Sequence, residues 1–300
     1  EHLACIELNE DAASSLSAAG FPAVHGDVRD LSLLNDIEAD LVWSSFPCQC
    51  FSTAGPRTGP KDDRNGWPWT VAAISAMNPK PRWFIGENVS GLRSHKTECD
   101  PVCVGPELCP AAYLDQVILP DLLRLYDWVD YRILDCADYG VAQHRRRLII
   151  VAGPHPIDWP APTHGRFTGQ MDLFGRKLLP WKTIGEAIGV AAWATETNAS
   201  SGMVKRPRHP GVPSNSPVAG GHALGGLLGW FPINGSTDLG DCEFRRLVPE
   251  EIAIIQGFPP EHKILGKTSA SRFLQAGNAV PPALAKAVVE SIMEADRCPK

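Results

Sequence analysis

The sequence contains no run of roughly 18 or more apolar residues, the length that a membrane-spanning helix requires. It does not begin with the basic segment and long apolar stretch of a signal peptide, so we expect neither a membrane anchor nor secretion. It has no strong excess of charge, with 21% charged residues and a net charge of −6. Nine cysteines, an odd number in a chain of 300 residues, favour reduced thiols over a disulfide framework. These absences predict a soluble cytoplasmic protein.

Asp and Glu are absent from Thr197 to Thr237, although the chain as a whole is acidic. This segment contains Lys205, Arg206 and Arg208, and a local basic stretch can contact phosphates even in an acidic protein. On its own, such a stretch is more often a solvated loop. It becomes a candidate nucleic-acid contact only if other parts of the sequence indicate nucleic-acid chemistry.

The first half of the chain alternates short apolar runs with helical stretches, which predicts an α/β domain with a parallel sheet covered by helices. From 154 to 242, glycine, proline and tryptophan are frequent and periodicity is weak, which favours loops and short strands. The expected strands are 3–6, 41–43, 83–85, 131–134 and 148–151, and the expected helices are 9–19, 69–77, 114–126, 184–188, 249–256 and 282–296.

Three strings with chemically active side chains lie next to expected strands. Cys48 lies on a proline-flanked turn, in Ser-Phe-Pro-Cys-Gln-Cys-Phe-Ser, directly after one strand. Glu87, in Glu-Asn-Val, ends the next strand. Arg145 and Arg147 flank Arg146 in an extended segment, so the outer two should point the same way. A thiol, an acid and two cations are the groups needed to attack an electron-poor ring.

In this order and spacing the strings resemble those of the DNA (cytosine-5) methyltransferase family, and the resemblance extends over nearly the whole chain. Residues 277–282 match the family's Gly-Asn-Ala-Val-Pro-Pro string, and 244–251 with 256–259 resemble its ninth motif. The implied fold is α/β: a Rossmann-like sheet of an S-adenosylmethionine-dependent methyltransferase, with a small, loop- and strand-rich target-recognition domain. The compact form resembles prokaryotic or phage-encoded modification enzymes of the cytoplasm.

The resemblance implies methyl transfer from S-adenosylmethionine to C5 of cytosine in a specific duplex DNA sequence, on a base flipped out of the helix. Cys48 would form a covalent adduct at C6, since a soft thiolate adds well to a conjugated carbon. Glu87 would supply the proton that N3 takes up. Arg147 would hold the O2 edge of cytosine, and Arg145 would support the loop that holds the thiol. Cys50 occupies a variable position of the family pattern and has no assigned catalytic role.

Two acids at strand ends suit a nucleotide-like cofactor. Glu7 is positioned for ribose hydroxyls and Asp27 for an adenine amino group, although each acid alone is more often a helix cap. The resemblance assigns both to S-adenosylmethionine. It also assigns adenine contact and lining of the cofactor site to Leu8, Val28, Pro47, Asn278 and Val280. The family opens with a strand and a Phe-x-Gly-x-Gly-Gly loop, and this sequence contains neither of them. We therefore expect the chain to be a fragment of a longer polypeptide.

The resemblance divides the chain into a cofactor-binding and catalytic domain (1–153), a target-recognition domain that includes the ninth motif (154–270) and a C-terminal helix that returns to the catalytic domain (271–300). Residues 53–67 resemble the mobile loop that closes over the flipped base. Double-stranded DNA is the implied partner, a cognate restriction endonuclease is a further one, no membrane partner is expected, and the protein should be a monomer. The candidate DNA contacts are Gln49, Ser52, Lys205, Arg206 and Arg208.

A separate cluster has side chains suited to tetrahedral zinc: His95, Cys99, Cys103 and Cys109. Its C-x3-C-x5-C spacing is not a common zinc-finger pattern, and the resemblance requires no metal here. Loop thiols without a metal are therefore expected, and a structural zinc site is left open.

Two other functions remain open at this point. An RNA cytosine-5 methyltransferase would use the same chemistry, but the Cys-Phe-Thr string that marks the tRNA-modifying relatives is absent. A catalytically silent, methyltransferase-like DNA-binding or regulatory protein would need none of Cys48, Glu87, Arg145 and Arg147. The missing glycine-rich loop is the feature that fits such a protein, and the retained catalytic set favours an enzyme.

Overall fold

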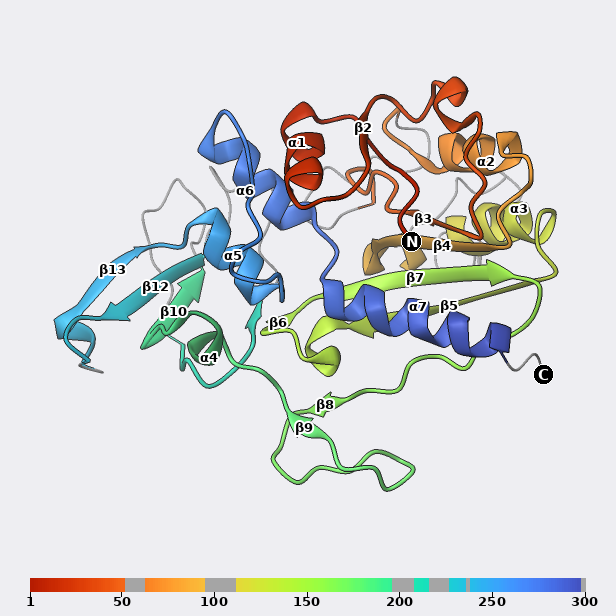
Figure 1. The fold of residues 1–300 in the computed structure, drawn as a ribbon. Coiled ribbons are helices and arrows are strands. Elements are labelled where there is room, and N and C mark those ends of the chain that lie inside the picture. The colour runs from red at the N-terminus through yellow and green to blue at the C-terminus, as the bar shows by residue number, and fades with distance from the viewer. Residues whose placement is uncertain (52–62, 95–111, 196–207, 216–226, 236–237, 298–300) are drawn as a thin grey trace, which may run out of the picture.

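The main body of the molecule is a four-stranded sheet with helices on both faces. The structure, a computed structural model, describes residues 1–51, 63–94, 112–195, 208–215, 227–235 and 238–297 (Figure 1). The strands follow the order β3 (Leu41–Ser44), β4 (Trp83–Val89), β7 (Arg146–Gly153) and β5 (Trp128–Asp135). Mixed α/β architecture is therefore present, as expected from the alternating sequence pattern.

The expectation of an all-parallel sheet is wrong at β7. β3 and β4 run parallel, whereas β7 is antiparallel to both of its neighbours, β4 and β5. The connection from β5 to β7 contains a 3₁₀ turn at Cys136–Tyr139 and the two-residue strand β6 (Gln143–His144). A parallel return needs a crossover of a dozen or more residues, and this link is shorter, so the chain can only reverse.

A second, separate sheet lies at the N-terminal end. β1 (Cys5–Glu7) and β2 (Ala23–His25) pair in parallel, with α1 (Glu10–Ala18) as their crossover. Asn9 caps α1 as expected, because its side chain accepts a hydrogen bond from the backbone N–H of Ala12. Among the described residues, β1 has no strand partner except β2, and β3 has none except β4.

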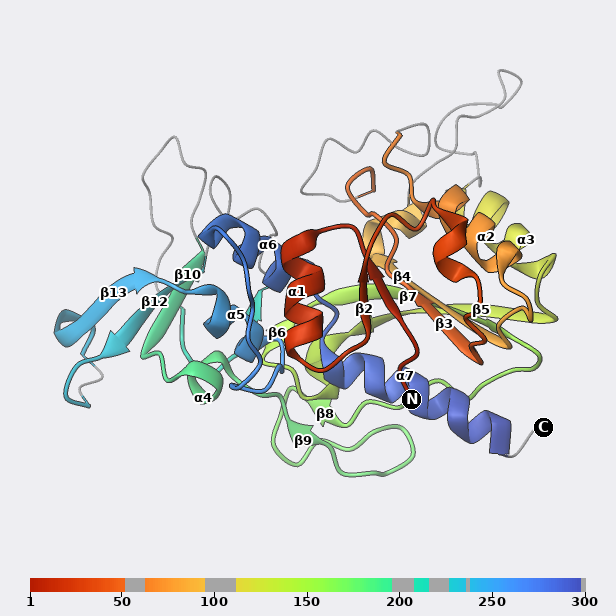
Figure 2. The same ribbon diagram turned by 45° about the horizontal axis from the view of Figure 1, so that its top comes forward.

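The two faces of the main sheet bury different helices, as the twofold alternation of side chains along a strand requires. On one face, Ile85 and Ile149 pack with Leu284 and Val288 of α7 (Pro282–Arg297). On the other, Phe84 and neighbouring strand residues pack against α2 (Trp67–Ala76) and α3 (Leu119–Leu123), which a π-helical turn at Leu114–Ile118 precedes. Figures 1 and 2 show α7 along one face and α2 and α3 on the opposite one.

A third cluster of buried residues lies beyond the end of the main sheet. It joins α4 (Ile184–Ile188), α5 (Pro249–Ile255) and α6 (Ser269–Asn278) to a small antiparallel sheet. We expected α4 and α5 from the sequence but did not expect α6 as a helix. The small sheet has the order β10 (Ala192–Thr195), β12 (Leu227–Pro232) and β13 (Cys242–Arg246), and the remaining strands are β8 (His164–Gly165), β9 (Leu179–Pro180) and β11 (Ser214–Asn215).

Among the described residues, no helix combines the length and apolar character needed to cross a bilayer.

Candidate active site

Cys48 lies on a turn that follows β3 at the carboxyl end of the strand. Phe46 and Phe51 are buried on either side of it, and the N–H of Phe51 donates to the carbonyl of Cys48 at 2.9 Å. Gly66 packs directly against this turn, because a Cβ at that position would lie 2.3 Å from Cδ of Pro47. The buried side chains of Phe46 and Phe51 and the close contact between Gly66 and Pro47 therefore hold the turn in place. Cys48 is half-buried, whereas Cys50 is completely buried, in keeping with a structural role for the second thiol.

Asn88 ties this turn to the neighbouring strand. Its Nδ2 donates to the carbonyl of Phe46 at 3.0 Å, and its Oδ1 accepts from the N–H of Val89 at 2.9 Å. Asn88 is 2% exposed, so both contacts lie in the protein interior. Asn88 therefore orients the backbone of the thiol turn and of its own strand.

Glu87 and Arg147 form an ion pair across β4 and β7. Nε of Arg147 lies 2.9 Å from Oε1 of Glu87, and only 13% and 8% of the two side chains are exposed. Val89 is the residue directly opposite Arg147, so the ion pair runs diagonally across the two strands. Glu87 lies inside β4, which extends beyond the expected strand end to Val89.

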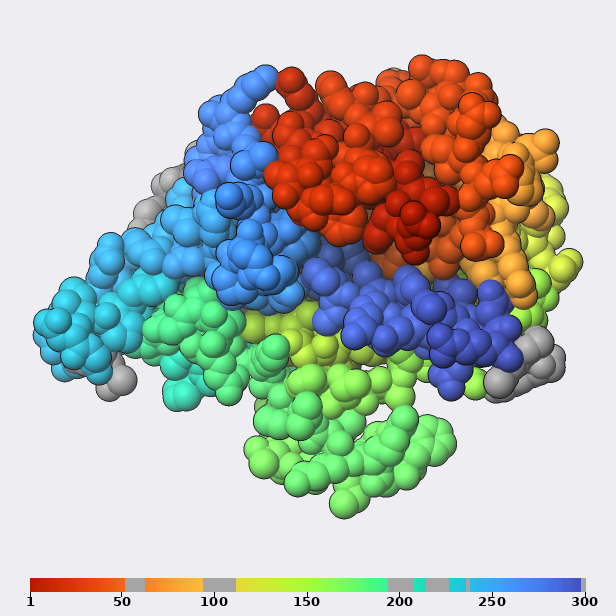
Figure 3. Space-filling model, viewed as in Figure 1, coloured from red at the N-terminus to blue at the C-terminus, as the bar shows by residue number. Residues whose placement is uncertain are grey.

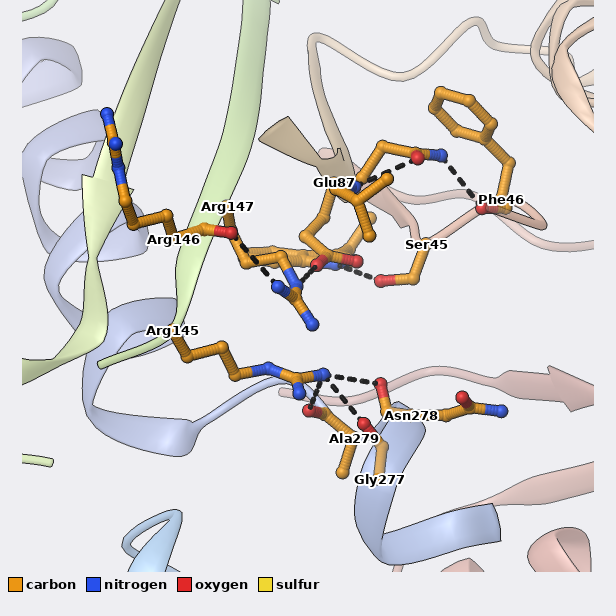
Figure 4. A network of polar contacts seen from close by, with 12 residues as sticks. Ser45, Phe46, Glu87, Arg145, Arg146, Arg147, Gly277, Asn278 and Ala279 are labelled. Atoms are coloured by element: carbon orange, nitrogen blue, oxygen red, sulfur yellow. Dashed lines mark hydrogen bonds and ion pairs between the residues drawn. The ribbon is translucent and has the colours of Figure 1, made fainter. Parts of the chain in front are cut away.

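Arg145 has a different partner from the one that we expected. It points to the same side as Arg147, with Arg146 on the opposite side, which agrees with the alternation in the sequence (Figure 4). Its Nη2 donates to the carbonyls of Gly277 at 2.9 Å and Ala279 at 3.1 Å. The expected support of the thiol turn by Arg145 is thus incorrect: Arg145 supports the link between α6 and α7, and Asn88 supports the thiol turn.

Asp135 fixes the direction in which Arg145 projects. Its Oδ1 accepts from the backbone N–H of Arg145 at 3.0 Å and of Ala137 at 3.2 Å. Its Oδ2 lies 3.0 Å from Nδ1 of His144. Asp135 was not among the expected site residues, although an Asp at the end of an apolar strand is a common cap for the following turn. Burial lowers the pKa of Arg145 to about 10, so the guanidinium stays charged near neutral pH.

The electrostatics at Cys48 favour the thiol over the thiolate when no substrate is bound. Burial raises the pKa of Cys48 above its ordinary value, and the negative charge of Glu87 raises it further. The positive charges of Arg147 and Arg145 act in the opposite direction and only partly compensate. Cys48, Glu87 and the two arginines therefore influence one another electrostatically at one edge of the sheet.

The expected cofactor residues lie at strand ends and helix links. Glu7 ends β1, and its Oε1 accepts from the N–H of Asn9 at 2.8 Å. Leu8 is 64% exposed, which leaves a large apolar surface beside that carboxylate. Val28, Pro47 and Val280 are half-buried and Asn278 is exposed. An acid next to exposed apolar surface fits the ribose and adenine of a nucleotide-like cofactor.

The carboxylate of Asp27 already accepts hydrogen bonds from Arg29. Arg29 donates from Nε to Oδ2 of Asp27 at 2.9 Å, and also from its backbone N–H to Oδ1 at 3.0 Å. These hydrogen bonds lower the pKa of Asp27 to about 2. Binding of an adenine amino group by Asp27 would require the carboxylate to be shared with Arg29.

Few of the expected DNA contacts lie in the described part of the chain. Gln49 is exposed on the thiol turn. The backbone of Arg208 pairs with that of Trp193, and its guanidinium carbon lies 4.9 Å from the centre of the Trp193 ring. Outside the described residues lie Ser52, Lys205, Arg206 and most of the expected mobile loop 53–67, together with the candidate zinc ligands His95, Cys99, Cys103 and Cys109. No group of three or more potential metal ligands occurs within the described ranges.

Gln256 belongs to the string that resembles the ninth motif, but no role of its own was expected for it. It is completely buried, and its Nε2 donates to the carbonyl of Ala276, next to the link that Arg145 holds. The available signal was a glutamine directly after the apolar run 252–255, since a polar side chain buried beside such a run is nearly always hydrogen-bonded.

The sequence of this chain is similar to those of known DNA methyltransferases. A family model described as C-5 cytosine-specific DNA methylase matches residues 1–168 and 196–294. The Type II methyltransferase M.NaeI of Lentzea aerocolonigenes is 29% identical over 98% of this chain and 70% of its own length. The Type II methyltransferase M.AplI of Arthrospira platensis is 30% identical over 84% of this chain and 68% of its own length.

The fold resembles solved structures as well. The S. pombe Dnmt2 methyltransferase superposes with a TM-score of 0.64 at 16% identity, covering 99% of this chain and 92% of its own. Since the family model spans most of the chain and includes the strings around Cys48, Glu87 and Arg147, the chain belongs to the C-5 cytosine-specific DNA methylase family and is a DNA (cytosine-5) methyltransferase.

Proposed function

We propose that Cys48, Glu87, Arg145 and Arg147 are the catalytic set with which this chain methylates C5 of a cytosine flipped out of a specific duplex DNA sequence. The observation that supports this most directly is the mutual electrostatic influence of the four groups around a half-buried thiol. A binding protein without catalysis has no use for a thiol flanked by an acid and two cations.

The proposed chemistry follows from the low nucleophilicity of C5 in the cytosine ring. C5 is a poor nucleophile until a thiolate adds to C6, which converts the ring to an enamine. Glu87 supplies the proton that N3 takes up as charge builds on the ring. When bound, S-adenosylmethionine supplies a methyl group on a positively charged sulfur. Loss of the C5 proton to solvent, expulsion of the Cys48 thiolate and return of the N3 proton to Glu87 then release the neutral methylated base.

Arg147 has two tasks in this scheme. Its Nε orients the carboxyl group of Glu87 from 2.9 Å. The planar guanidinium can also donate to the O2 edge of the cytosine, because it carries more donors than the single ion pair uses. Arg145 acts indirectly, because it holds the 277–279 backbone that leads to Val280.

The cofactor residues that we propose end or follow the strands β1, β2 and β3 or belong to the link between α6 and α7. Glu7 would bind the ribose hydroxyls and Asp27 the adenine amino group. Leu8 would give apolar contact on the adenine. The remaining contacts would come from Val28, Pro47, Asn278 and Val280.

We further propose a separate function for each part of the chain. Residues 1–153 and 271–300 would provide the catalytic and cofactor-binding body, and 154–270 would recognise the target. The protein would act as a monomer on duplex DNA in the cytoplasm, alongside a cognate restriction endonuclease.

Bisulfite sequencing tests the function in one experiment. Host DNA from cells that express the protein should contain protected cytosines in one sequence context, and DNA from cells that express Cys48→Ala should contain none. Complete conversion of cytosine in both samples would contradict the proposal.

A further inference from the structure

Residues 163–181 form a lobe that projects from the body of the protein. The two ends of the lobe, β8 and β9, lie side by side in parallel. Trp181 anchors the base, because its Nε1 donates to Oδ1 of Asp138 at 2.9 Å. Figure 3 shows the lobe as a separate protrusion beyond α7. The body of the protein therefore holds the lobe only at its base.

The outer part of the lobe, residues 170–178, is a hydrogen-bonded hairpin. The N–H of Leu178 donates to the carbonyl of Gln170 at 2.8 Å, and the N–H of Asp172 donates to the carbonyl of Arg176 at 2.9 Å. Oδ1 of Asp172 accepts from the N–H groups of Phe174 and Arg176, each at 2.8 Å. Gly175 turns the chain with a φ of 77°, which glycine adopts without strain. These bonds give the tip one defined conformation.

This defined tip displays apolar side chains to solvent. Leu173 is 100% exposed and Phe174 is 83% exposed. Phe167, Met171 and Leu179 of the same lobe are each at least 60% exposed. Scattered exposed apolar residues are ordinary, but several on one small lobe with a defined conformation mark an interaction site. A preorganised tip also loses little conformational entropy on binding.

The charges of the lobe narrow the choice of partner. Arg166, Arg176 and Lys177 are exposed on it, and the only carboxylate of residues 163–181, Asp172, accepts internal hydrogen bonds. A second copy of the same basic lobe would repel it. The arginines are not extended toward phosphates, because Arg176 lies 5.7 Å from the Phe174 ring and Arg166 lies 5.2 Å from the Phe167 ring. An apolar pocket with an acidic rim, on another protein, fits this surface.

We propose that residues 170–178 dock the enzyme on a sliding clamp, a ring protein that encircles duplex DNA. The choice of a DNA-encircling partner rests on the proposed function, in which duplex DNA is the substrate. The lobe lies beyond α7, and the catalytic groups lie at the start of β7, so both could be engaged at once. The proposed clamp-binding surface consists of Leu173 and Phe174, two adjacent exposed apolar side chains, with the exposed Gln170 in the same hairpin.

The test measures binding of the full chain to a purified bacterial sliding clamp by isothermal titration calorimetry, without DNA or cofactor. Wild-type protein should bind, and L173A/F174A should bind at least roughly 30-fold more weakly, as expected for loss of apolar anchors. Leu123→Ala, which removes a leucine that is 57% exposed on α3, is the matched control and should bind like wild type. Methylation of a short free duplex should be the same for all three proteins.

Three results would overturn the proposal. The wild-type chain could fail to bind the clamp, or L173A/F174A could bind it as well as wild type does. Alternatively, the double variant could lose affinity for bare duplex or change its oligomeric state, which would make the lobe a DNA wedge or a self-association surface. Clamp binding requires no methyl transfer, so an inactive enzyme that still binds the clamp would contradict the proposed function alone.

Discussion

Nε of Arg147 lies 2.9 Å from Oε1 of Glu87, and the two side chains have opposite effects on the thiol of Cys48. The carboxylate raises the pKa of the thiol and the guanidinium lowers it. Loss of either partner therefore changes both the geometry of the pair and the balance of charge at the nucleophile. This relationship makes the protonation of Cys48 a direct probe of the proposed site.

The first prediction concerns the reactivity of Cys48. Glu87→Gln removes a charge that raises the pKa of the thiol, so a larger fraction is thiolate at a fixed pH below that pKa. Arg147→Met removes a charge that lowers the pKa and should have the opposite effect. Iodoacetamide labelling of the Cys48 peptide, followed by mass spectrometry from about pH 7 to 10, should be faster in Glu87→Gln and slower in Arg147→Met. Identical pH profiles for all three proteins would refute this electrostatic coupling.

The second prediction separates protonation from binding. Glu87→Gln should reduce methyl transfer by on the order of 10²-fold or more, the usual scale for loss of a positioned acid. Affinity for S-adenosylhomocysteine, measured by calorimetry, should change little because Glu87 is not among the proposed cofactor contacts. Wild-type turnover in the variant would remove Glu87 from the mechanism.

The third prediction distinguishes the two neighbouring thiols. Cys48→Ala should abolish methyl transfer while DNA binding persists. Cys50→Ala should stay active, at a stability cost of about 1 kcal/mol for an altered buried site, because Cys50 is enclosed in the core. DNA that contains 5-fluorocytosine should trap a covalent adduct with wild type and Cys50→Ala. An adduct that survives in Cys48→Ala would rule out Cys48 as the nucleophile.

The fourth prediction concerns Arg145 as a positioning residue. Arg145→Met leaves the buried carbonyls of Gly277 and Ala279 without their donor, which should lower the free energy of unfolding by roughly 1.5–3 kcal/mol. The loosened link should also weaken S-adenosylhomocysteine binding, because Asn278 and Val280 belong to it. Arg146→Met is the matched control, since Arg146 is exposed on the opposite side of the strand. Urea unfolding and calorimetry of both variants should differ; equal values would contradict the assigned role.

The fifth prediction concerns DNA recognition. Phosphate contacts add affinity without sequence information, so neutralising Lys205, Arg206 or Arg208 singly should weaken binding about equally for all sequences. The salt dependence should fall by about one unit for each lost phosphate contact. The methylated sequence should stay unchanged, whereas replacing 154–242 with the segment of a relative that has another target should move it. An active exchanged enzyme that still methylates the original site would exclude this region from recognition.

The sequence alone determined the parts of the fold and site that depend on neighbouring residues. Apolar runs predicted the cores of β3, β4, β5 and β7, and Thr183 and Gly189 bracket the helix α4 at the expected bounds. The common direction of Arg145 and Arg147 followed from strand alternation. The placement of Cys48 and Glu87 at the ends of neighbouring parallel strands followed as well, whereas the arginines at the start of β7 reach them only because β7 is antiparallel.

Only the tertiary structure decided which distant groups meet. Arg145 could have supported any nearby backbone, and its contact with Gly277 joins positions more than a hundred residues apart. Asp27 pairs with Arg29, and Leu173 and Phe174 stay in solvent although their apolar character alone would suit a core. The physical reason is that hydrogen bonding and burial are decided by which surfaces the packed helices and strands bring together. Local sequence determines conformation along the chain, but it does not specify the partner across it.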